Sequence, residues 1–266
     1  MLNMFSKFSA TMVLFLFAAV SLQAADISAY YDAPYADEKT VKSKLGKEGF
    51  KVLTSYSPAG KENLKVMVIT NNALTSMASK NLRGFAAIQR VMVDSTAKTV
   101  RVTNPGYWIP AFMQKDYKAG SDSAITASLK KALGTLSPTK DVLKKSDLAN
   151  YHFMVAMPYY EDMLELREGD ALSVKKKKKL FEIKLANGST LVGVKMSKGS
   201  ENFIDKIGTE NALLLPYTVL IENGKAYALH AKYYLAISYP LLSMGQFMKI
   251  SSIPDTIERS LKKSVK

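Results

Sequence analysis

Groups of tyrosines and other aromatic residues are the part of this sequence best suited to binding chemistry. They occur near residues 31, 107, 159 and 233. Clustered rings with polar tips suit a ligand cleft or a partner surface, and they equally suit strand ends packed on helices. We predict a ligand site where these groups meet, with an asparagine and a histidine as polar contacts. Its candidate residues are Tyr31, Tyr35, Asn104, Tyr107, Trp108, Tyr159, His230 and Tyr234.

The chain has two histidines, His152 and His230. A neutral imidazole can ligate a metal or act as a base, but a zinc or copper site needs further ligands at suitable spacing. No His-x-x-x-His pair or nearby acidic pattern supplies them. Met154 and Met157 follow the spacing of core residues. The sequence therefore predicts no metal site and no cofactor.

Signatures of catalysis are missing from the sequence. It contains no Gly-x-Ser-x-Gly elbow, no phosphate-binding glycine loop and no dinucleotide fingerprint. The absence of cysteine excludes disulfides, covalent haem attachment and a thiol nucleophile. The acidic residues of 161–170 are typical of an exposed helix face. We therefore predict a binding or accessory role without catalysis; the alternative is a hydrolase or isomerase that uses a tyrosine or His230.

A run of five lysines is the strongest charge feature of this basic chain, whose formal net charge is +14. Five like charges repel one another, so the run is expected to be exposed. It could dock on anionic lipid at about 1 kcal/mol per lysine, or the acidic residues of 161–170 could neutralise it, or it could simply be solvated. The candidate surface-contact residues are Lys175, Lys176, Lys177, Lys178 and Lys179.

The first 24 residues have the pattern of a signal peptide. Lys7 precedes an apolar stretch, residues 8–22, and Ala24 offers a small residue before a cleavage site. The stretch is shorter than the ~20 residues of a spanning helix, so cleavage and a periplasmic location are predicted. The alternative is an uncleaved anchor in the inner membrane. An exported basic protein favours a small molecule, an envelope protein or an anionic membrane surface as its partner, and nucleic acid is not expected.

An apolar hairpin organises the rest of the chain. Residues 212–221 and 226–229 read as strands around Asn223-Gly224, whose residues suit a two-residue turn. A weaker copy occupies residues 88–103, and Ser128-Leu129-Lys130-Lys131 reappears as Ser260-Leu261-Lys262-Lys263. These matches predict an α+β fold of two repeated small-sheet-plus-helices modules packed as pseudo-symmetric halves. The predicted repeats are residues 25–134 and 151–266, with residues 135–150 as the connection.

Periodicity predicts the individual elements. Strands are expected at 26–32, 51–56, 64–70, 181–185 and 190–196, and helices at 38–48, 73–80, 123–133, 200–207 and 255–265. The start of the second repeat is predicted as a strand at 152–156 followed by a helical segment through residues 163–166. That choice aligns Met157-Pro158-Tyr159 with Ala33-Pro34-Tyr35. A short helical piece is expected around Val142 and Leu143.

Several short motifs of the first repeat form a recognisable set: Lys39-Thr40-Val41, Lys47-Glu48-Gly49-Phe50-Lys51-Val52-Leu53 and a strand that ends at Asn71. With these motifs the repeat resembles the bacterial domain-of-unknown-function family 302. In the second repeat, Leu213-Leu214-Leu215-Pro216 is similar to the family's late strand pair. It implies compact α+β domains with a small sheet backed by helices, and it implies no activity. The sequence departs from the family at Asn72, where proline is frequent, and the second repeat lacks the Gly-Phe helix exit.

Overall fold

The computed structural model describes residues 25–266. The predicted signal peptide, residues 1–24, lies outside the described residues. Within residues 25–266, no helix combines the length and the apolar character required to cross a membrane.

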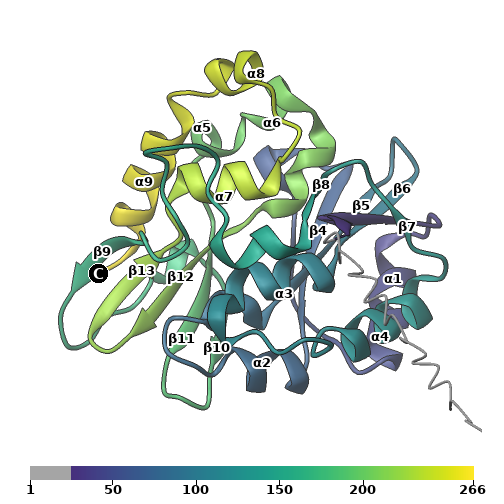
Figure 1. The fold of residues 1–266 in the computed structure, drawn as a ribbon, viewed down its shortest axis with the longest axis horizontal. Coiled ribbons are helices and arrows are strands. Elements are labelled where there is room, and N and C mark those ends of the chain that lie inside the picture. Colours follow the sequence, from purple (N-terminus) through teal and green to yellow (C-terminus); the bar gives the residue numbers. More distant parts are fainter. Residues whose placement is uncertain (1–24) are drawn as a thin grey trace, which may run out of the picture.

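The first part of the chain builds an antiparallel sheet with the strand order β3-β4-β5-β6-β2-β7 (Figure 1). Its strands are β2 (Tyr30–Ala33), β3 (Lys51–Tyr56), β4 (Leu64–Thr70), β5 (Gln89–Asp94), β6 (Thr99–Thr103) and β7 (Ser137–Pro138). The helices are α1 (Glu38–Lys47), α2 (Asn72–Ala78), α3 (Pro105–Met113) and α4 (Ser123–Leu133). The short 3₁₀ helices are η1 (Pro58–Gly60), η2 (Gly84–Ala87), η3 (Gln114–Asp116) and η4 (Lys145–Asn150).

Side-chain caps fix where these helices begin. The Asp37 carboxylate accepts a hydrogen bond from the Thr40 backbone nitrogen at 2.9 Å, and Asn71 accepts one from the Leu74 backbone nitrogen at 2.9 Å. Such caps satisfy backbone N–H groups that have no partner within the helix. Gly49 follows α1 with a φ of 81°, a backbone conformation that favours glycine. Local sequence therefore sets the ends of these elements.

The second part of the chain builds an antiparallel sheet with the order β10-β11-β12-β13-β9. Its strands are β9 (Leu164–Glu168), β10 (Lys179–Lys184), β11 (Thr190–Val194), β12 (Tyr217–Glu222) and β13 (Lys225–Ala228). The helices are α5 (Lys198–Glu201), α6 (Ile204–Ile207), α7 (Ala231–Ser238), α8 (Met244–Lys249) and α9 (Ile253–Ser264), with 3₁₀ turns at η5 (Lys176–Lys178) and η6 (Thr209–Leu214). A separate ribbon pairs β1 (Asp26–Ser28) with β8 (Val142–Lys144). The predicted α+β class is confirmed.

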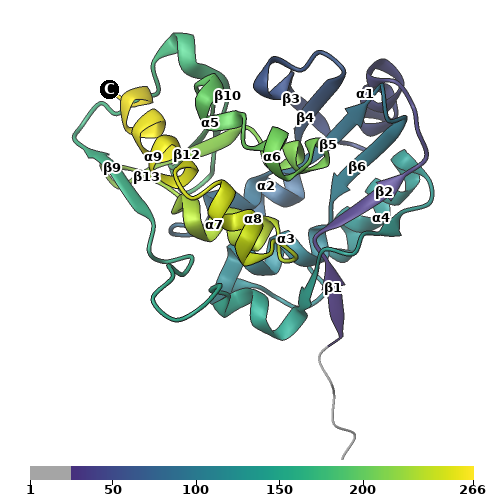
Figure 2. The same ribbon diagram turned by 90° about the horizontal axis from the view of Figure 1, so that it is seen from above.

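The two sheets share one hydrophobic core. Figure 2 shows their strands on opposite sides of the molecule, with α3, α6 and α7 between them. Every residue of α3 is buried. η2 packs on β11 and β12, whereas η6 packs on β5 and β6, so each 3₁₀ helix contacts the sheet of the other part of the chain. At Gly84 the approach is so close that an added Cβ would collide with the Leu220 side chain.

Three predicted elements are wrong. Residues 152–156 form no strand, and residues 164–168 form β9 instead of a helix. In that segment Leu164 and Leu166 alternate with charged residues, and this period of two places both leucines on one face of a strand paired with β13. Val142–Lys144 is likewise a strand, β8, paired with β1.

The organising hairpin begins later than predicted. Residues 212–214 belong to η6, and β12 starts at Tyr217. Pro216 has no N–H to donate to a neighbouring strand, so it is unsuited to the interior of the sheet. The apolar character of residues 212–215 reflects burial between the two parts of the chain and not strand pairing.

Candidate functional site

The aromatic residues predicted near 107 and 234 do come together. Tyr107 and Trp108 lie on α3 and Tyr234 lies on α7, and all three are buried. The ring centroids of Trp108 and Tyr234 are 6.2 Å apart, with the rings edge to face. Phe112 lies 6.3 Å from Tyr234. These rings pack the centre of the core, between the two sheets.

Three tyrosine hydroxyls cap the end of α7. Tyr107 donates to the Ile237 carbonyl at 2.6 Å, Tyr30 donates to that of Ser238 at 2.8 Å, and Tyr151 donates to that of Ala236 at 3.2 Å. The last carbonyls of a helix lack partners within it, and burial makes an unpaired carbonyl costly. Burial raises the pKa of Tyr107 and Tyr30, and it raises the pKa of Tyr151 to about 12. The hydroxyls therefore stay protonated and act as donors.

Asn104 and His230 are the N-cap residues of α3 and α7. The Asn104 side chain accepts from the Gly106 nitrogen at 2.9 Å and donates to the Ser28 carbonyl at 2.6 Å. His230 Nδ1 accepts from the Lys232 nitrogen at 3.2 Å. Burial lowers the pKa of His230, which favours the neutral ring that this acceptor role requires. Both polar groups are thus engaged with backbone.

Of the remaining predicted site residues, Tyr31 packs against this core, whereas Tyr35 and Tyr159 lie at the surface. Tyr35 is 39% exposed and has the Lys98 ammonium 4.9 Å from its ring centroid. Tyr159 is 44% exposed and packs against His152 with ring centroids 4.3 Å apart. Tyr31 is partly buried on β2. The structure therefore divides the eight predicted residues between a packed core and separate surface positions.

The lysine run spans η5 and the first residue of β10. Lys176 and Lys177 are exposed, Lys175 Nζ donates to the Lys263 carbonyl at 2.7 Å, and Lys179 pairs with Glu182 at 2.7 Å. The acidic residues expected to neutralise the run have other partners among the described residues. Glu161 pairs with Arg83, and Glu165 and Glu168 both pair with Lys225.

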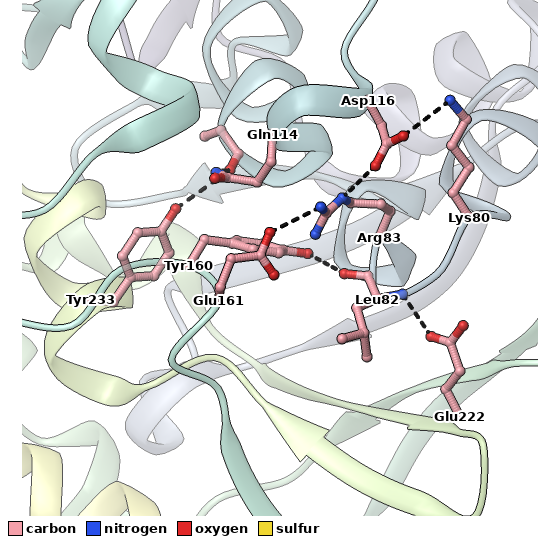
Figure 3. Close-up of polar contacts among 10 residues, drawn as sticks. Lys80, Leu82, Arg83, Gln114, Asp116, Tyr160, Glu161, Glu222 and Tyr233 are labelled. Atoms are coloured by element: carbon pink, nitrogen blue, oxygen red, sulfur yellow. Dashed lines mark hydrogen bonds and ion pairs between the residues drawn. The ribbon is translucent and has the colours of Figure 1, made fainter.

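A buried arginine network ties distant segments together (Figure 3). The side chain of Arg83 is 4% exposed; its Nε pairs with Asp116 at 3.0 Å and its Nη2 with Glu161 at 2.9 Å. The guanidinium carbon of Arg83 lies over the ring of Tyr160, 5.3 Å from the ring centroid. The Tyr160 hydroxyl donates to the Leu82 carbonyl at 2.6 Å. These bonds join the loop before η2 to the segment that precedes β9.

The same loop is also held from the second sheet. Glu222 on β12 accepts from the Leu82 nitrogen at 3.0 Å and from Asn187 Nδ2 at 3.0 Å. Burial raises the pKa of Glu222. Arg83 Nη1 is buried without a hydrogen-bond partner among the described residues. Because its hydrogen bonds join the loop before η2 both to β12 and to the segment before β9, the network acts as a structural clasp between the two parts of the chain.

A cleft of about 480 Å³ opens where the two parts of the chain meet at β3. One wall comes from the end of β3 and η1, and the other from β10, the end of β11 and α5. Its lining residues are Tyr56, Ser57, Ala59, Gly60, Glu62, Leu180, Lys195, Met196, Lys198 and Glu201. We call it the Glu201 cleft.

Glu201 is the distinctive group of this cleft. It is 5% exposed, and its Oε2 accepts from the Ala59 backbone nitrogen at 2.6 Å while its Oε1 accepts from the Tyr56 hydroxyl at 3.4 Å. Ala59 has a φ of 53°, which is uncommon for a residue other than glycine. Burial raises the pKa of Glu201. A buried acid with a perturbed pKa beside a cleft is typical of a functional site.

The walls of the Glu201 cleft give it mixed character. Leu180 and Met196 supply apolar surface, whereas Lys195 and Lys198 supply positive charge and Ser57 a hydroxyl. Such a lining can enclose the apolar body of a small molecule and orient its polar groups.

A second cleft, of about 510 Å³, lies between β2, β6, β7 and the segment from η6 to α8. Its charged pair is already satisfied internally: Arg101 donates to both oxygens of Asp32, at 2.8 and 3.1 Å. The Glu201 cleft holds the buried acid, so we take it as the candidate site.

Sequence reasoning missed Glu201. Its two partners, Ala59 and Tyr56, lie 142 and 145 residues away in the chain. The sequence near Glu201 contains no motif that predicts its burial. No local signal could have identified this site.

Among residues 25–266, no three histidine, aspartate or glutamate side chains are grouped closely enough to hold a metal ion. Comparison of the chain with protein-family models, with curated proteins and with solved structures gives no match.

Proposed function

We propose that the chain consists of two copies of one module, joined by residues 135–150. Two observations support this: the strands β3-β4-β5-β6-β2 and β10-β11-β12-β13-β9 have the same order along their sheets, and helices at α2 and at α5–α6 follow corresponding strands. α3 and α7 likewise follow β6 and β13. We also propose that the first module is related to the domain-of-unknown-function family 302, which it resembles in sequence. The segment between β9 and β10 contains no counterpart of α1.

We further propose that this is an exported envelope protein that binds a small ligand in the Glu201 cleft without catalysing a reaction on it. The observation that carries the proposal is the burial of Glu201 between the two modules at the wall of an open cleft, where its carboxyl group accepts from the Ala59 nitrogen and the Tyr56 hydroxyl and burial still raises its pKa. Burying a carboxyl is costly. A ligand that donates a hydrogen bond to Glu201 would offset that cost.

The lining indicates the class of ligand. An amphipathic molecule would place its apolar part against Leu180 and Met196 and direct a hydrogen-bond donor toward Glu201. A cleft of about 480 Å³ is within the range of sites for drug-sized molecules. Because the cleft is formed by both modules, the ligand would also hold them together.

An occluding variant tests the location of the ligand. The protein is purified from its own envelope, desalted and denatured, and the small molecules released are identified by mass spectrometry. The variant Ser57→Trp places a large side chain in the cleft from its rim. Wild-type protein should release a compound that this variant does not release. The equivalent variant away from the cleft, Ser95→Trp in the turn after β5, should retain it. Equal release from all three proteins would refute the proposed site.

A further inference from the structure

A shallow basic pocket lies on the other side of α5, beside α9. It has a volume of about 310 Å³ and is lined by Lys178, Ser197, Thr256, Arg259, Ser260 and Lys263. None of these residues lines the Glu201 cleft. Figure 2 shows α9, α5 and β10 gathered at one edge of the molecule. The lining residues lie on α9 or directly before α5 and β10.

Positive charge converges on the pocket without an acidic partner. Lys178, Arg259 and Lys263 form no ion pair among the described residues. Of the two acids on α9, Glu258 pairs with Lys262 at 2.7 Å, and Asp255, one turn before Arg259, forms no ion pair among the described residues. Arg259 and Lys263 are four residues apart on α9, a spacing at which like charges repel each other and destabilise a helix. An anion bound between them would offset that repulsion.

Hydroxyl groups complete the lining. Ser260 Oγ accepts from the Ser197 backbone nitrogen at 3.4 Å, and its own hydrogen has no acceptor within the described part of the chain. Thr256 Oγ1 accepts from Arg259 Nη2 at 3.4 Å, which holds the guanidinium against α9. The pocket therefore combines a planar guanidinium, two ammonium groups and a free hydroxyl donor on one concave surface.

We propose that this pocket binds a phosphate group. The guanidinium can donate two parallel hydrogen bonds to phosphate oxygens, and the lysines can neutralise the remaining charge. Ser260 then donates to a third oxygen. A phosphate monoester could come from a soluble molecule or from the headgroup of a lipid at the membrane surface, and the same residues would recognise both.

The first arm of the test uses inorganic phosphate. Calorimetric titration should show binding to the wild-type protein that Arg259→Gln and Lys263→Gln each weaken by about tenfold, the effect of losing one charge-assisted hydrogen bond. The matched control is Lys131→Gln. Lys131 is the last residue of the Ser-Leu-Lys-Lys sequence on α4, and Lys263 is the last residue of the same sequence on α9. This variant removes the same charge and should leave the affinity unchanged. Circular dichroism confirms that each variant is folded.

The second arm uses vesicles and distinguishes the two sources. If phosphatidic acid is the source, vesicles that contain it should bind the protein more tightly than phosphatidylglycerol vesicles of equal charge, and Arg259→Gln should abolish the difference. If a soluble phosphate is the source, inorganic phosphate binds and the two vesicles do not differ. The proposal is overturned if neither probe depends on Arg259, or if Lys131→Gln weakens binding as much as Lys263→Gln does.

Discussion

The backbone nitrogen of Ala59 lies 2.6 Å from Oε2 of Glu201, and this bond links η1 in the first part of the chain to α5 in the second. A bond to a buried carboxylate is stronger than one between neutral groups. It fixes the two walls of the Glu201 cleft relative to each other. The same carboxyl is therefore both a contact between the two parts of the chain and the polar group that we propose a ligand binds.

The raised pKa of Glu201 predicts how stability depends on pH. Since burial raises this pKa in the folded protein, the folded state binds the proton more tightly than the unfolded chain does. Stability should therefore fall as the pH rises from the ordinary range of glutamate through the raised pKa. Urea unfolding at a series of pH values should show this decline, and Glu201→Gln should make it shallower.

The control for that experiment is Glu62→Gln. Glu62 lines the same cleft, but its carboxylate is exposed and pairs with Lys65 at 2.9 Å. In Glu62→Gln, stability should fall with rising pH as steeply as in the wild type. Burial also raises the pKa of Glu222, so some decline should remain in the Glu201 variant. An identical pH profile for Glu201→Gln and wild type would contradict the burial of Glu201.

The tyrosine caps of α7 predict a loss of stability on removal of a single hydroxyl. Tyr107→Phe leaves the buried Ile237 carbonyl without the donor that lies 2.6 Å from it. The expected loss in the free energy of unfolding is about 1–3 kcal/mol. Tyr35→Phe, at a partly exposed ring, should change it by less than about 0.5 kcal/mol. Chemical denaturation of both variants measures the difference, and equal losses would argue against the capping role.

Replacement of Arg83 should lower the stability of the protein more than replacement of Lys80 does. Arg83→Met removes the two hydrogen bonds that the buried guanidinium donates to the part-buried carboxylate of Asp116 and the more exposed one of Glu161, and should lower stability by about 2–3 kcal/mol. Lys80 contacts the same Asp116 at 3.6 Å from a more exposed position. Lys80→Met should therefore cost less than about 1 kcal/mol. Thermal unfolding of the two variants compares them directly, and a more damaging Lys80 variant would refute the clasp.

Local signals were sufficient for much of the fold. β3, β4 and α4 have the bounds that periodicity and turn residues predict. Trp108 and Tyr234 meet as expected because each follows a hairpin. The helix predicted at β9 is wrong because aligning Met157-Pro158-Tyr159 with Ala33-Pro34-Tyr35 places this segment opposite α1, whereas its strand partner β13 lies far along the chain.

The Glu201 cleft could not be predicted from local sequence signals. Its polar contacts join residues that are more than a hundred positions apart, and the burial of Glu201 follows from how the two sheets pack and not from its neighbours in sequence. The tyrosines illustrate the same limit. Their grouping was visible in the sequence, but nothing there indicated that Tyr30 and Tyr107 donate to the end of α7, a helix from the other part of the chain.

The mass of the intact native protein tests the central claim most directly. Protein isolated from its own envelope is measured by native mass spectrometry and again after denaturation, for wild type, Glu201→Gln and Glu165→Gln. Glu165 pairs with Lys225 away from the cleft, so its variant removes a carboxyl without touching the site. We predict an added mass that disappears on denaturation, is retained in Glu165→Gln and is lost or strongly reduced in Glu201→Gln. A bare polypeptide mass for the wild type, or equal retention in both variants, would contradict a ligand held by Glu201.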